Sequence, residues 1–372
     1  MTVPDAAHFL EERYVRRPGS ARLLPLFYRA KPLIPRRAQM SLRRSIARRQ
    51  RRRHEACGQF PRWPIEPLLV DRHEDSLRGR LSRSGATRVP LLGNWPAGHR
   101  FAYILTHDVE GPKGLANVEP LLEIERKHGV ASAWFVVAED YHVDTAILDA
   151  IRAAGGEVGL HGLHHDGRLF QSREHFERQL PRIQRYLREW GAEGFRSPAT
   201  HRDASWMPEL GASYDSSFPD THPFDAQPGG CCSILPYFLG DLVELPITLP
   251  QDHTLFELLR EPDIALWRTK ATWIAEHGGL VTVLVHPDYA LTADRWDQYD
   301  QLLAFLRDLQ GGWHALPREV ARWWRRRAAL EAVLGESNPE PDAISALGAV
   351  RWWAQERNGR IVIDTEEELA HA

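Results

Sequence analysis

Short apolar runs alternate with longer helix-like stretches from Arg100 onward, and this alternation restricts the possible folds more than any other feature. Apolar runs of about four to eight residues bounded by Gly, Pro or polar residues are typical of buried strands. We expect strands at 101–106, 130–137, 156–160, 193–196, 212–215, 243–247 and 280–285. We expect helices near 115–128, 144–153, 171–190, 262–277 and 297–309. Strands that alternate with helices are joined by crossover connections, so the pattern predicts an α/β fold with parallel strands, either a barrel or an open sheet.

The composition is that of a globular protein. Hydrophobic residues make up 43% and charged residues 26% of the 372 residues, enough for a full core. No run of 18 apolar residues and no signal-peptide pattern is present. Three cysteines do not make a disulfide framework, which favours a reducing compartment. We therefore expect a cytoplasmic protein.

The segment 36–55 is strongly basic, with nine arginines against one acid, Glu55. It lacks Gly and Pro and carries Met40, Leu42 and Ile46 among the arginines, so we expect a helix. Such a helix either is solvated and pairs with the acidic remainder of the chain, or lies on an anionic membrane surface. No nucleic-acid motif or aromatic interleaving accompanies the arginines, so we expect no nucleic acid as partner.

The stretch Phe101–Pro112 is apolar at first and then turns acidic before a Gly-Pro break. This is how a buried strand reads when it ends at the rim of a sheet or barrel. Asp108 and Glu110 are two residues apart, so both carboxylates point to the same side of an extended chain. Two adjacent carboxylates repel unless a cation or a proton lies between them. The alternative is a solvated acidic turn.

A second short strand, at 156–160, ends in a cluster of histidines. His161 and His165 are four residues apart, so a helical turn would place both imidazoles on one side. Neutral imidazole is a ligand for zinc and also for iron, cobalt or nickel. Together with Asp108 and Glu110 these histidines form a plausible metal-binding set with open positions for water.

Three further motifs follow other predicted strands. Arg196 can pair with a carboxylate in a forked geometry, and Pro198 restricts the backbone next to Ala199, whose N–H could face an oxyanion. His286 ends the apolar run 280–285 and suits proton transfer, with Asp215 as an acid that could orient it. Each of these residues alone is as compatible with a purely structural role.

Taken in order, the motifs resemble those of the metal-dependent polysaccharide deacetylases, the NodB-homology group of carbohydrate esterase family 4. The motifs are Thr106–Pro112, His161–His165, Arg196–Pro198, Tyr214–Ser217 and Leu284–His286. The resemblance covers about residues 98–320 and implies a distorted (β/α) barrel of the polysaccharide-deacetylase type. It leaves residues 1–97 as an N-terminal extension with the Arg-rich helix, and 321–372 as a C-terminal helix and tail.

The resemblance also implies a role for each residue. Asp108 falls on the catalytic base and His286 on the general acid, with Asp215 as partner of that acid. Glu110, His161 and His165 fall on the metal ligands; Glu110 is one methylene longer than the aspartate usual in the family. Arg196 falls on the residue that holds the base, and the Ala199 amide on the oxyanion donor. His107 and His164 receive no role, and we expect them to pack or to support neighbouring residues.

The function implied by the resemblance is hydrolysis of an N- or O-linked acetyl group on a sugar. The substrate would be an acetylated sugar of a cell-envelope glycan or its intracellular precursor, and the cofactor a divalent metal, most simply zinc, with cobalt, nickel or iron as alternatives. Two other interpretations remain open: a metal-dependent amidohydrolase acting on a cyclic ureide or imide, and a carbohydrate-binding protein with a decayed site. If the substrate is an intracellular glycan precursor, the basic segment 36–55 would hold the enzyme at the inner membrane surface.

Overall fold

A computed structural model describes residues 5–15, 36–225, 227–289, 292–334 and 348–365. Parts of the expected N-terminal extension, at 16–35, and of the expected C-terminal tail, at 335–347 and 366–372, lie outside the described residues.

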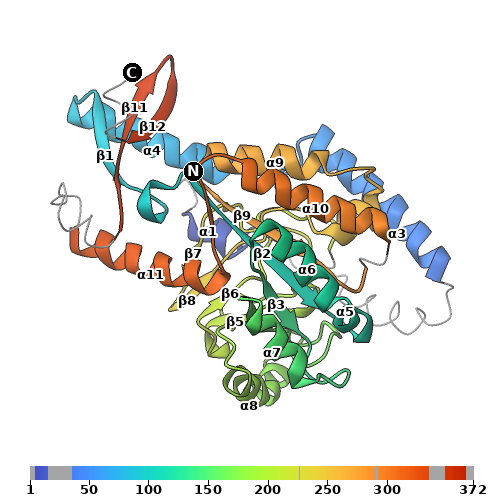
Figure 1. The fold of residues 1–372 in the computed structure, drawn as a ribbon. Helices are drawn as coiled ribbons and strands as arrows, with labels where there is room; N and C mark the ends of the chain where they lie inside the picture. The colour runs from blue at the N-terminus through green and yellow to red at the C-terminus, as the bar shows by residue number, and fades with distance from the viewer. Residues whose placement is uncertain (1–4, 16–35, 226, 290–291, 335–347, 366–372) are drawn as a thin grey trace.

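A curled sheet of nine strands forms the centre of the described part of the chain (Figure 1). The strands are β2 (Phe101–Val109), β3 (Ala133–Val136), β4 (Glu157–Leu160), β5 (Gly194–Phe195), β6 (Tyr214–Asp215), β7 (Tyr237–Leu239), β8 (Leu242–Glu244), β9 (Leu280–Val285) and β10 (Gly312–His314). All neighbouring pairs are parallel except the β7–β8 hairpin. The predicted α/β class with parallel strands is confirmed.

The sheet curls round on itself through the chain that follows β8. Leu249 N donates to Thr282 O of β9 at 3.1 Å, and Thr248 Oγ1 donates to Leu280 O at 2.7 Å. Since β9 also pairs with β2 along its length, the two ends of the sheet approach each other. The result is a distorted (β/α) barrel, as expected from the sequence, rather than an open sheet.

β2 is the central strand of this barrel, and all nine of its residues are buried. It pairs with β9 on one side and with β3 and β10 on the other. A strand buried on both faces needs a continuous apolar run, which is why Phe101–Leu105 lacks the polar alternation of a half-exposed strand.

Helices pack around the sheet and end at local sequence signals. They are α5 (Pro112–Ala116), α6 (Val118–His128), α7 (Thr145–Ala153), α8 (Arg173–Glu189), η7 (His253–Leu259), α9 (Ala265–Glu276), α10 (Ala293–Asp308) and α11 (Pro317–Leu334), with short turns η4 (Pro96–Gly98), η5 (Pro198–Thr200) and η6 (Met207–Leu210). The Ser172 side chain caps α8 by accepting from His175 N, and Asp144 caps α7 in the same way. α6 ends at Gly129, whose φ of 68° is the left-handed conformation that glycine adopts without strain.

α11 covers one part of the barrel core. Its Trp323 and Trp324 are buried and pack in one cluster with Trp95, which directly precedes η4, and with Ala102 and Ile104 of β2. These tryptophans cover one side of the barrel.

A second, three-stranded sheet lies beside the barrel. It consists of β1 (Arg88–Leu92), β11 (Arg351–Arg357) and β12 (Arg360–Thr365) and packs against α4 (Leu68–Ser84) through Leu77 and Leu81. Figure 1 shows this unit at the upper left, away from the barrel strands. β12 pairs with β11 and not with the barrel sheet.

The basic segment forms a helix, as predicted: α3 (Arg36–Arg51) continues into a π-helical turn, η3 (Arg52–Ala56). Ala47 is buried against the barrel, and Arg44 Nε donates to Glu257 O of η7 at 2.8 Å. On the outer side Leu42 and Ile46 are 55% and 49% exposed. The short helix α1 (Ala7–Leu10) lies near the start of the chain.

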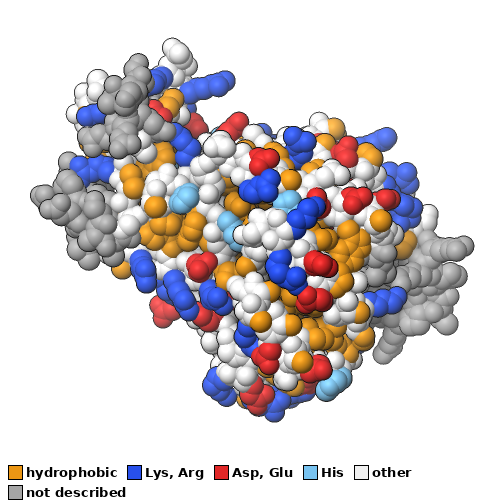
Figure 2. Space-filling view, viewed as in Figure 1, with side chains coloured by type: hydrophobic (Ala, Val, Ile, Leu, Met, Phe, Trp, Pro, Cys, Tyr) orange, Lys and Arg blue, Asp and Glu red, His pale blue; other side chains and the backbone are white. Residues whose placement is uncertain are grey.

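Within the described residues, no helix combines the length and the apolar character needed to cross a bilayer. On the face shown in Figure 2, basic and acidic side chains are interspersed, with small hydrophobic patches between them.

Candidate active site

The predicted site residues lie at the carboxyl ends of neighbouring barrel strands. Asp108 is the penultimate residue of β2, and Glu110 follows that strand directly. His161 follows β4, Arg196 follows β5 and His286 follows β9. Because parallel strands end at the same rim, residues far apart in sequence meet there.

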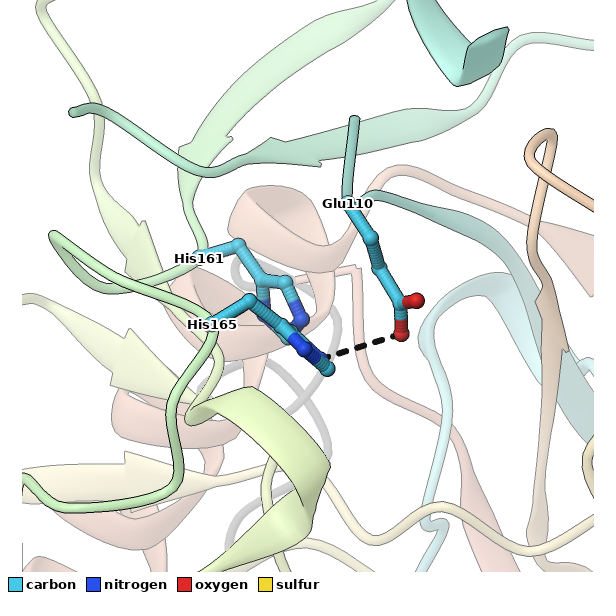
Figure 3. Close-up of side chains that lie close together, drawn as sticks. All are labelled: Glu110, His161 and His165. Atoms are coloured by element: carbon cyan, nitrogen blue, oxygen red, sulfur yellow. Dashed lines mark ion pairs between the residues drawn. The ribbon is translucent and has the colours of Figure 1, made fainter. Parts of the chain in front are cut away.

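Three of these residues converge on one point. Ligand-type atoms of Glu110, His161 and His165 all lie within 4.8 Å of one another. Figure 3 shows the two imidazoles close together, with the Glu110 carboxylate directed at His165. His165 Nε2 is 3.0 Å from Glu110 Oε1, and the two imidazole centroids are 5.4 Å apart. The structure therefore brings together the three residues predicted as metal ligands.

This donor set fits a divalent cation. His161 Nδ1 lies 2.9 Å from Arg196 O, so it carries the proton and leaves Nε2 with a free lone pair. Nε2 of His161 and Nε2 of His165 are buried, and neither makes a regular hydrogen bond to any described residue. Two buried imidazole nitrogens that face a carboxylate, with His165 Nε2 3.0 Å from Glu110 Oε1, form a donor set that suits zinc, and other divalent transition metals share this preference.

The electrostatics of the three residues also favour a cation. Burial lowers the pKa of His161 to about 4 despite the nearby Asp108, so its imidazole is neutral. Burial acts to raise the pKa of Glu110, but His165, His286 and His161 outweigh it and hold that pKa below the usual range. Burial acts to lower the pKa of His165, but the hydrogen bond and the charge of Glu110, with a smaller contribution from Asp108, raise this pKa overall. A metal ion would displace the proton of His165 when it binds.

Asp108 lies beside this cluster and is almost completely buried. Its Oδ1 accepts from Arg196 Nη1 at 3.0 Å, and its Oδ2 lies 3.6 Å from His161 Nε2. Burial acts to raise the pKa of Asp108, but His161, Arg196 and His286 together hold it below the ordinary value. The carboxylate is therefore ionised at neutral pH and can accept a proton.

Arg196 itself is fixed by a dense set of contacts. It is fully buried, and besides Asp108 it donates to Thr106 Oγ1 at 2.8 Å and, through Nε and Nη2, to the carbonyl and the hydroxyl of Ser216. Its guanidinium lies 4.4 Å from the centroid of the Phe135 ring. A forked side chain held at both ends can position a carboxylate rigidly.

His286 faces the same cluster from the end of β9, the strand that pairs with β2. Its Nε2 is 3.7 Å from Glu110 Oε1 and 3.9 Å from Asp108 Oδ2. Its Nδ1 lies 2.6 Å from Asp252 Oδ1, and its backbone N–H donates to Asp252 Oδ2 at 2.9 Å. Burial acts to lower the pKa of His286, but Asp252, followed by Glu110 and Asp108, raises it to about 10.

The prediction that Asp215 orients His286 is wrong, because Asp252 occupies that place. Asp215 lies on β6, and its carboxylate accepts from the backbone and hydroxyl of Ser217. Burial raises the pKa of Asp215 to about 6, although the hydrogen bond with the adjacent Glu244 acts to lower it. β6 pairs with β5 and β8, whereas His286 follows β9, so the two residues leave different strands of the barrel.

Ala199 lies in a strained turn next to the histidines. Ala199 and Thr200 have φ values of 53° and 51°, a conformation that non-glycine residues rarely adopt. Pro198 packs so closely on Gly162, the neighbour of His161, that a Cβ there would lie 2.9 Å from the proline ring. No described residue accepts a hydrogen bond from the Ala199 N–H, and the residue is exposed.

The local conformation of the histidine motif differs from the sequence-based expectation. His161 to His165 form an irregular loop and not a helical turn, with Gly162 at a φ of 69°. His164 reaches Asp140, with Nδ1 and Oδ1 2.8 Å apart. His107 is buried and contacts Glu125 and Tyr299, a packing role as expected.

Three site residues were missed by sequence reasoning. Asp252 belongs to the polar stretch 251–256, but its spacing does not connect it to His286. Asp288 accepts from Glu110 N at 2.8 Å, and Tyr289 Oη donates to Glu110 Oε2 at 2.9 Å. Asp288 and Tyr289 directly follow His286-Pro287, and this position at the rim was the sequence signal that could have identified them.

Comparison with known proteins supports the resemblance seen in the sequence. Residues 99–205 match the family model described as polysaccharide deacetylase. No curated protein matches the sequence significantly.

Three solved structures match this fold with nearly equal TM-scores. A protein of Mycobacterium smegmatis assigned as a polysaccharide deacetylase is 22% identical, with a TM-score of 0.52, over 65% of this chain and 95% of its own. One of Pseudomonas aeruginosa PAO1 with the same assignment is 16% identical, with a TM-score of 0.51, over 63% and 93%. The Puue allantoinase is 14% identical, with a TM-score of 0.52, over 64% and 94%. The fold is thus that of the polysaccharide deacetylases, and the resemblance to this family is confirmed.

Proposed function

We infer that this chain, whose residues 99–205 match the polysaccharide deacetylase family, is a metal-dependent hydrolase that removes an N- or O-linked acetyl group from a sugar. Its substrate would belong to a cell-envelope glycan or a precursor of one. The observation that carries the proposal is the convergence of Glu110, His161 and His165 beside Asp108 and His286.

Glu110, His161 and His165 would hold the cation, most simply zinc. When bound, such an ion supplies Lewis acidity toward a carbonyl oxygen and lowers the pKa of a water molecule to about 7. The neutral state of His161 and the ionised state of Glu110 match what such ligands require.

Asp108 and His286 divide the proton transfers. Asp108 is ionised and held by Arg196, so it accepts the proton of the attacking water. His286 is kept protonated by Asp252, so it donates a proton to the departing amine or alcohol. The Nε2 of His286 and the Oδ2 of Asp108 are 3.9 Å apart, which leaves both groups within reach of one reacting carbon.

The N–H of Ala199 supplies the hydrogen bond to the developing oxyanion. Ala199 is exposed, its N–H has no acceptor among the described residues, and the turn that carries it has positive φ values and is packed through Pro198 against Gly162. A donor that is already oriented needs no reorganisation during the reaction, which is the condition for strong oxyanion stabilisation.

The proposal is tested by acetate release from acetylated amino sugars and acetylated glycan fragments. Asp108→Asn and His286→Ala should each lower kcat by about 100-fold or more, the usual contribution of a positioned acid or base. The matched controls are Asp149→Asn and His175→Ala, which change an exposed residue of α7 and a half-buried residue of α8. Near-wild-type release from either site variant would remove that residue from the mechanism.

Metal dependence is tested with the same assay. Chelation should abolish acetate release, and addition of zinc, cobalt, nickel or iron should restore it to different extents, which would identify the preferred ion. Full activity of a metal-free preparation would contradict the proposed ligand roles. Because the Puue allantoinase has the same fold, cyclic ureides and imides are assayed in parallel, and hydrolysis of these alone would change the substrate class.

We also propose that α3 contacts an anionic membrane surface. Its outer side presents Leu42 and Ile46, one helical turn apart, with the exposed Arg48 and Arg49 beside them. Partly inserted aliphatic residues flanked by arginines are typical of interfacial helices, each basic residue contributing about 1 kcal/mol near anionic lipid.

Vesicle co-sedimentation tests this contact. The protein should bind vesicles that contain phosphatidylglycerol more strongly than vesicles of phosphatidylcholine alone, and a double Arg48→Glu/Arg49→Glu variant should lose the difference. Arg185→Glu/Arg188→Glu on α8 is the control with the same charge change. Equal binding to both lipids at low salt would contradict the proposal.

A further inference from the structure

The two carboxylate oxygens of Glu110 have different surroundings. Oε1 faces the histidines, at 3.0 Å from His165 Nε2 and 3.7 Å from His286 Nε2. Oε2 accepts a hydrogen bond from Tyr289 Oη at 2.9 Å. One oxygen is therefore directed to the cluster and the other is occupied by a tyrosine.

Tyr289 is itself held in place. Its backbone N–H donates to His286 O at 3.0 Å, and its ring lies 5.1 Å from that of His253 and 5.5 Å from that of His286. Its hydroxyl lies 2.9 Å from a carboxylate oxygen, which can only accept, so the tyrosine is the donor. The hydroxyl is therefore a fixed donor aimed at Glu110.

The preceding residue holds the backbone of the same glutamate. Asp288 Oδ2 accepts from Glu110 N at 2.8 Å, and Oδ1 accepts from Gly114 N, at the start of α5, at 3.1 Å. Gly114 is necessary here, because a Cβ would lie 2.2 Å from Asp288 Oδ2. Two consecutive residues after His286-Pro287 thus fix Glu110 at both its main chain and its side chain.

These contacts restrict the conformational freedom that glutamate has as a metal ligand. Glutamate has one more rotatable bond than aspartate, so its carboxylate samples more positions and loses more conformational entropy when it binds an ion. A hydrogen bond to Oε2 restricts those positions and leaves only Oε1 directed at the histidines. Outer hydrogen bonds of this kind commonly change metal affinity by about 10- to 100-fold.

We propose that Tyr289 and Asp288 are positioning residues that orient Glu110 for one-oxygen coordination of the cation. Tyr289 orients the side chain, and Asp288 anchors the main chain from which it extends. The inference rests on the proposed function, because it assumes that Glu110 is a ligand.

Metal affinity measured by competition with a chromophoric chelator tests the inference without any assay of activity. Tyr289→Phe should raise the Kd for zinc or cobalt by about 10- to 100-fold. Tyr14→Phe is the matched control, because it also removes a half-buried tyrosine donor, one that bonds Gly230 O at 2.6 Å, and it should leave the Kd within about twofold of wild type.

A shorter ligand distinguishes orientation of Glu110 from a general effect of the hydroxyl. In an Glu110→Asp background the carboxylate ends one methylene earlier and no longer meets Tyr289 Oη. Tyr289→Phe should then change the Kd by less than about twofold, so that the two substitutions are strongly coupled.

Each outcome has a separate meaning. Wild-type affinity in Tyr289→Phe, or an equal loss in both backgrounds, would overturn the positioning role while leaving the proposed function intact. Absence of cation binding by the wild-type protein would overturn the metal assignment itself and this inference with it. Equal melting temperatures of the metal-free variants would show that the fold is unchanged.

Discussion

Replacement of Arg196 by lysine should destabilise the protein strongly although the charge is kept. Arg196 is fully buried and uses three nitrogens: Nη1 toward Asp108 and Thr106, and Nε and Nη2 toward Ser216. A lysine ammonium is a single point, so it can serve only one of these two ends.

The magnitude follows from the bonds that would be lost. If the lysine keeps Asp108, the Ser216 carbonyl loses its donor at 2.6 Å inside the core, which costs about 1–3 kcal/mol. The bond to Ser216 Oγ at 2.7 Å is charge-assisted, and its loss costs about 1.5–3 kcal/mol, although the hydroxyl still donates to Leu245 O. We therefore expect the free energy of unfolding to fall by about 3–5 kcal/mol.

Urea unfolding followed by tryptophan fluorescence and far-ultraviolet circular dichroism measures this change. Arg178→Lys is the matched control: Arg178 is 59% exposed and pairs with Glu174 on the surface of α8, so its replacement should cost less than about 0.5 kcal/mol. An Arg196→Lys variant within about 1 kcal/mol of wild type would refute the claim that the forked geometry, and not the charge alone, holds this part of the barrel.

Three further predictions concern the pH dependence, the proton donor and the packing. Burial raises the pKa of Glu157 from 4.5 to about 7, so between these pH values the native state binds more protons than the unfolded state and stability falls as the pH rises. Wild-type protein should therefore lose about 3 kcal/mol of unfolding free energy between pH 4.5 and 8. Glu157→Gln should lack this loss, which is measured by comparing the unfolding free energies of the two proteins across that pH range. Asp252→Asn should lower kcat by about 10- to 100-fold with little change in KM, because His286 keeps its place but loses the carboxylate that keeps it protonated. An unchanged kcat in the acetate-release assay would contradict this role of Asp252. Gly194→Ala should lower the melting temperature substantially, because a Cβ would lie 2.1 Å from the Tyr214 ring, and a melting temperature equal to wild type in calorimetry would show that the ring can move away.

The class of fold was predictable because a buried parallel strand is recognisable from local sequence. The run 101–105 is apolar throughout and the run 280–285 is apolar except for Thr282, and both lie in fully buried strands. The small sheet of β1, β11 and β12 was mostly missed, since residues 88–92 and 351–357 are half-exposed and contain Arg, Pro and Gln. Their pairing depends on α4, whose contact with them is invisible in either segment alone.

The sequence by itself determined which residues stand at the rim of the barrel. An apolar strand that turns polar at its carboxyl end places those polar side chains at the rim, and Asp108 at the end of β2 and His161 and His286 directly after β4 and β9 lie there as the pattern predicted. Tertiary structure alone decided the partners of these residues: Asp252 in place of Asp215 beside His286, and Tyr289 on Glu110. A hydrogen bond depends on the order of the strands in the sheet and the path of the loops between them, and neither leaves a periodic signature along the chain.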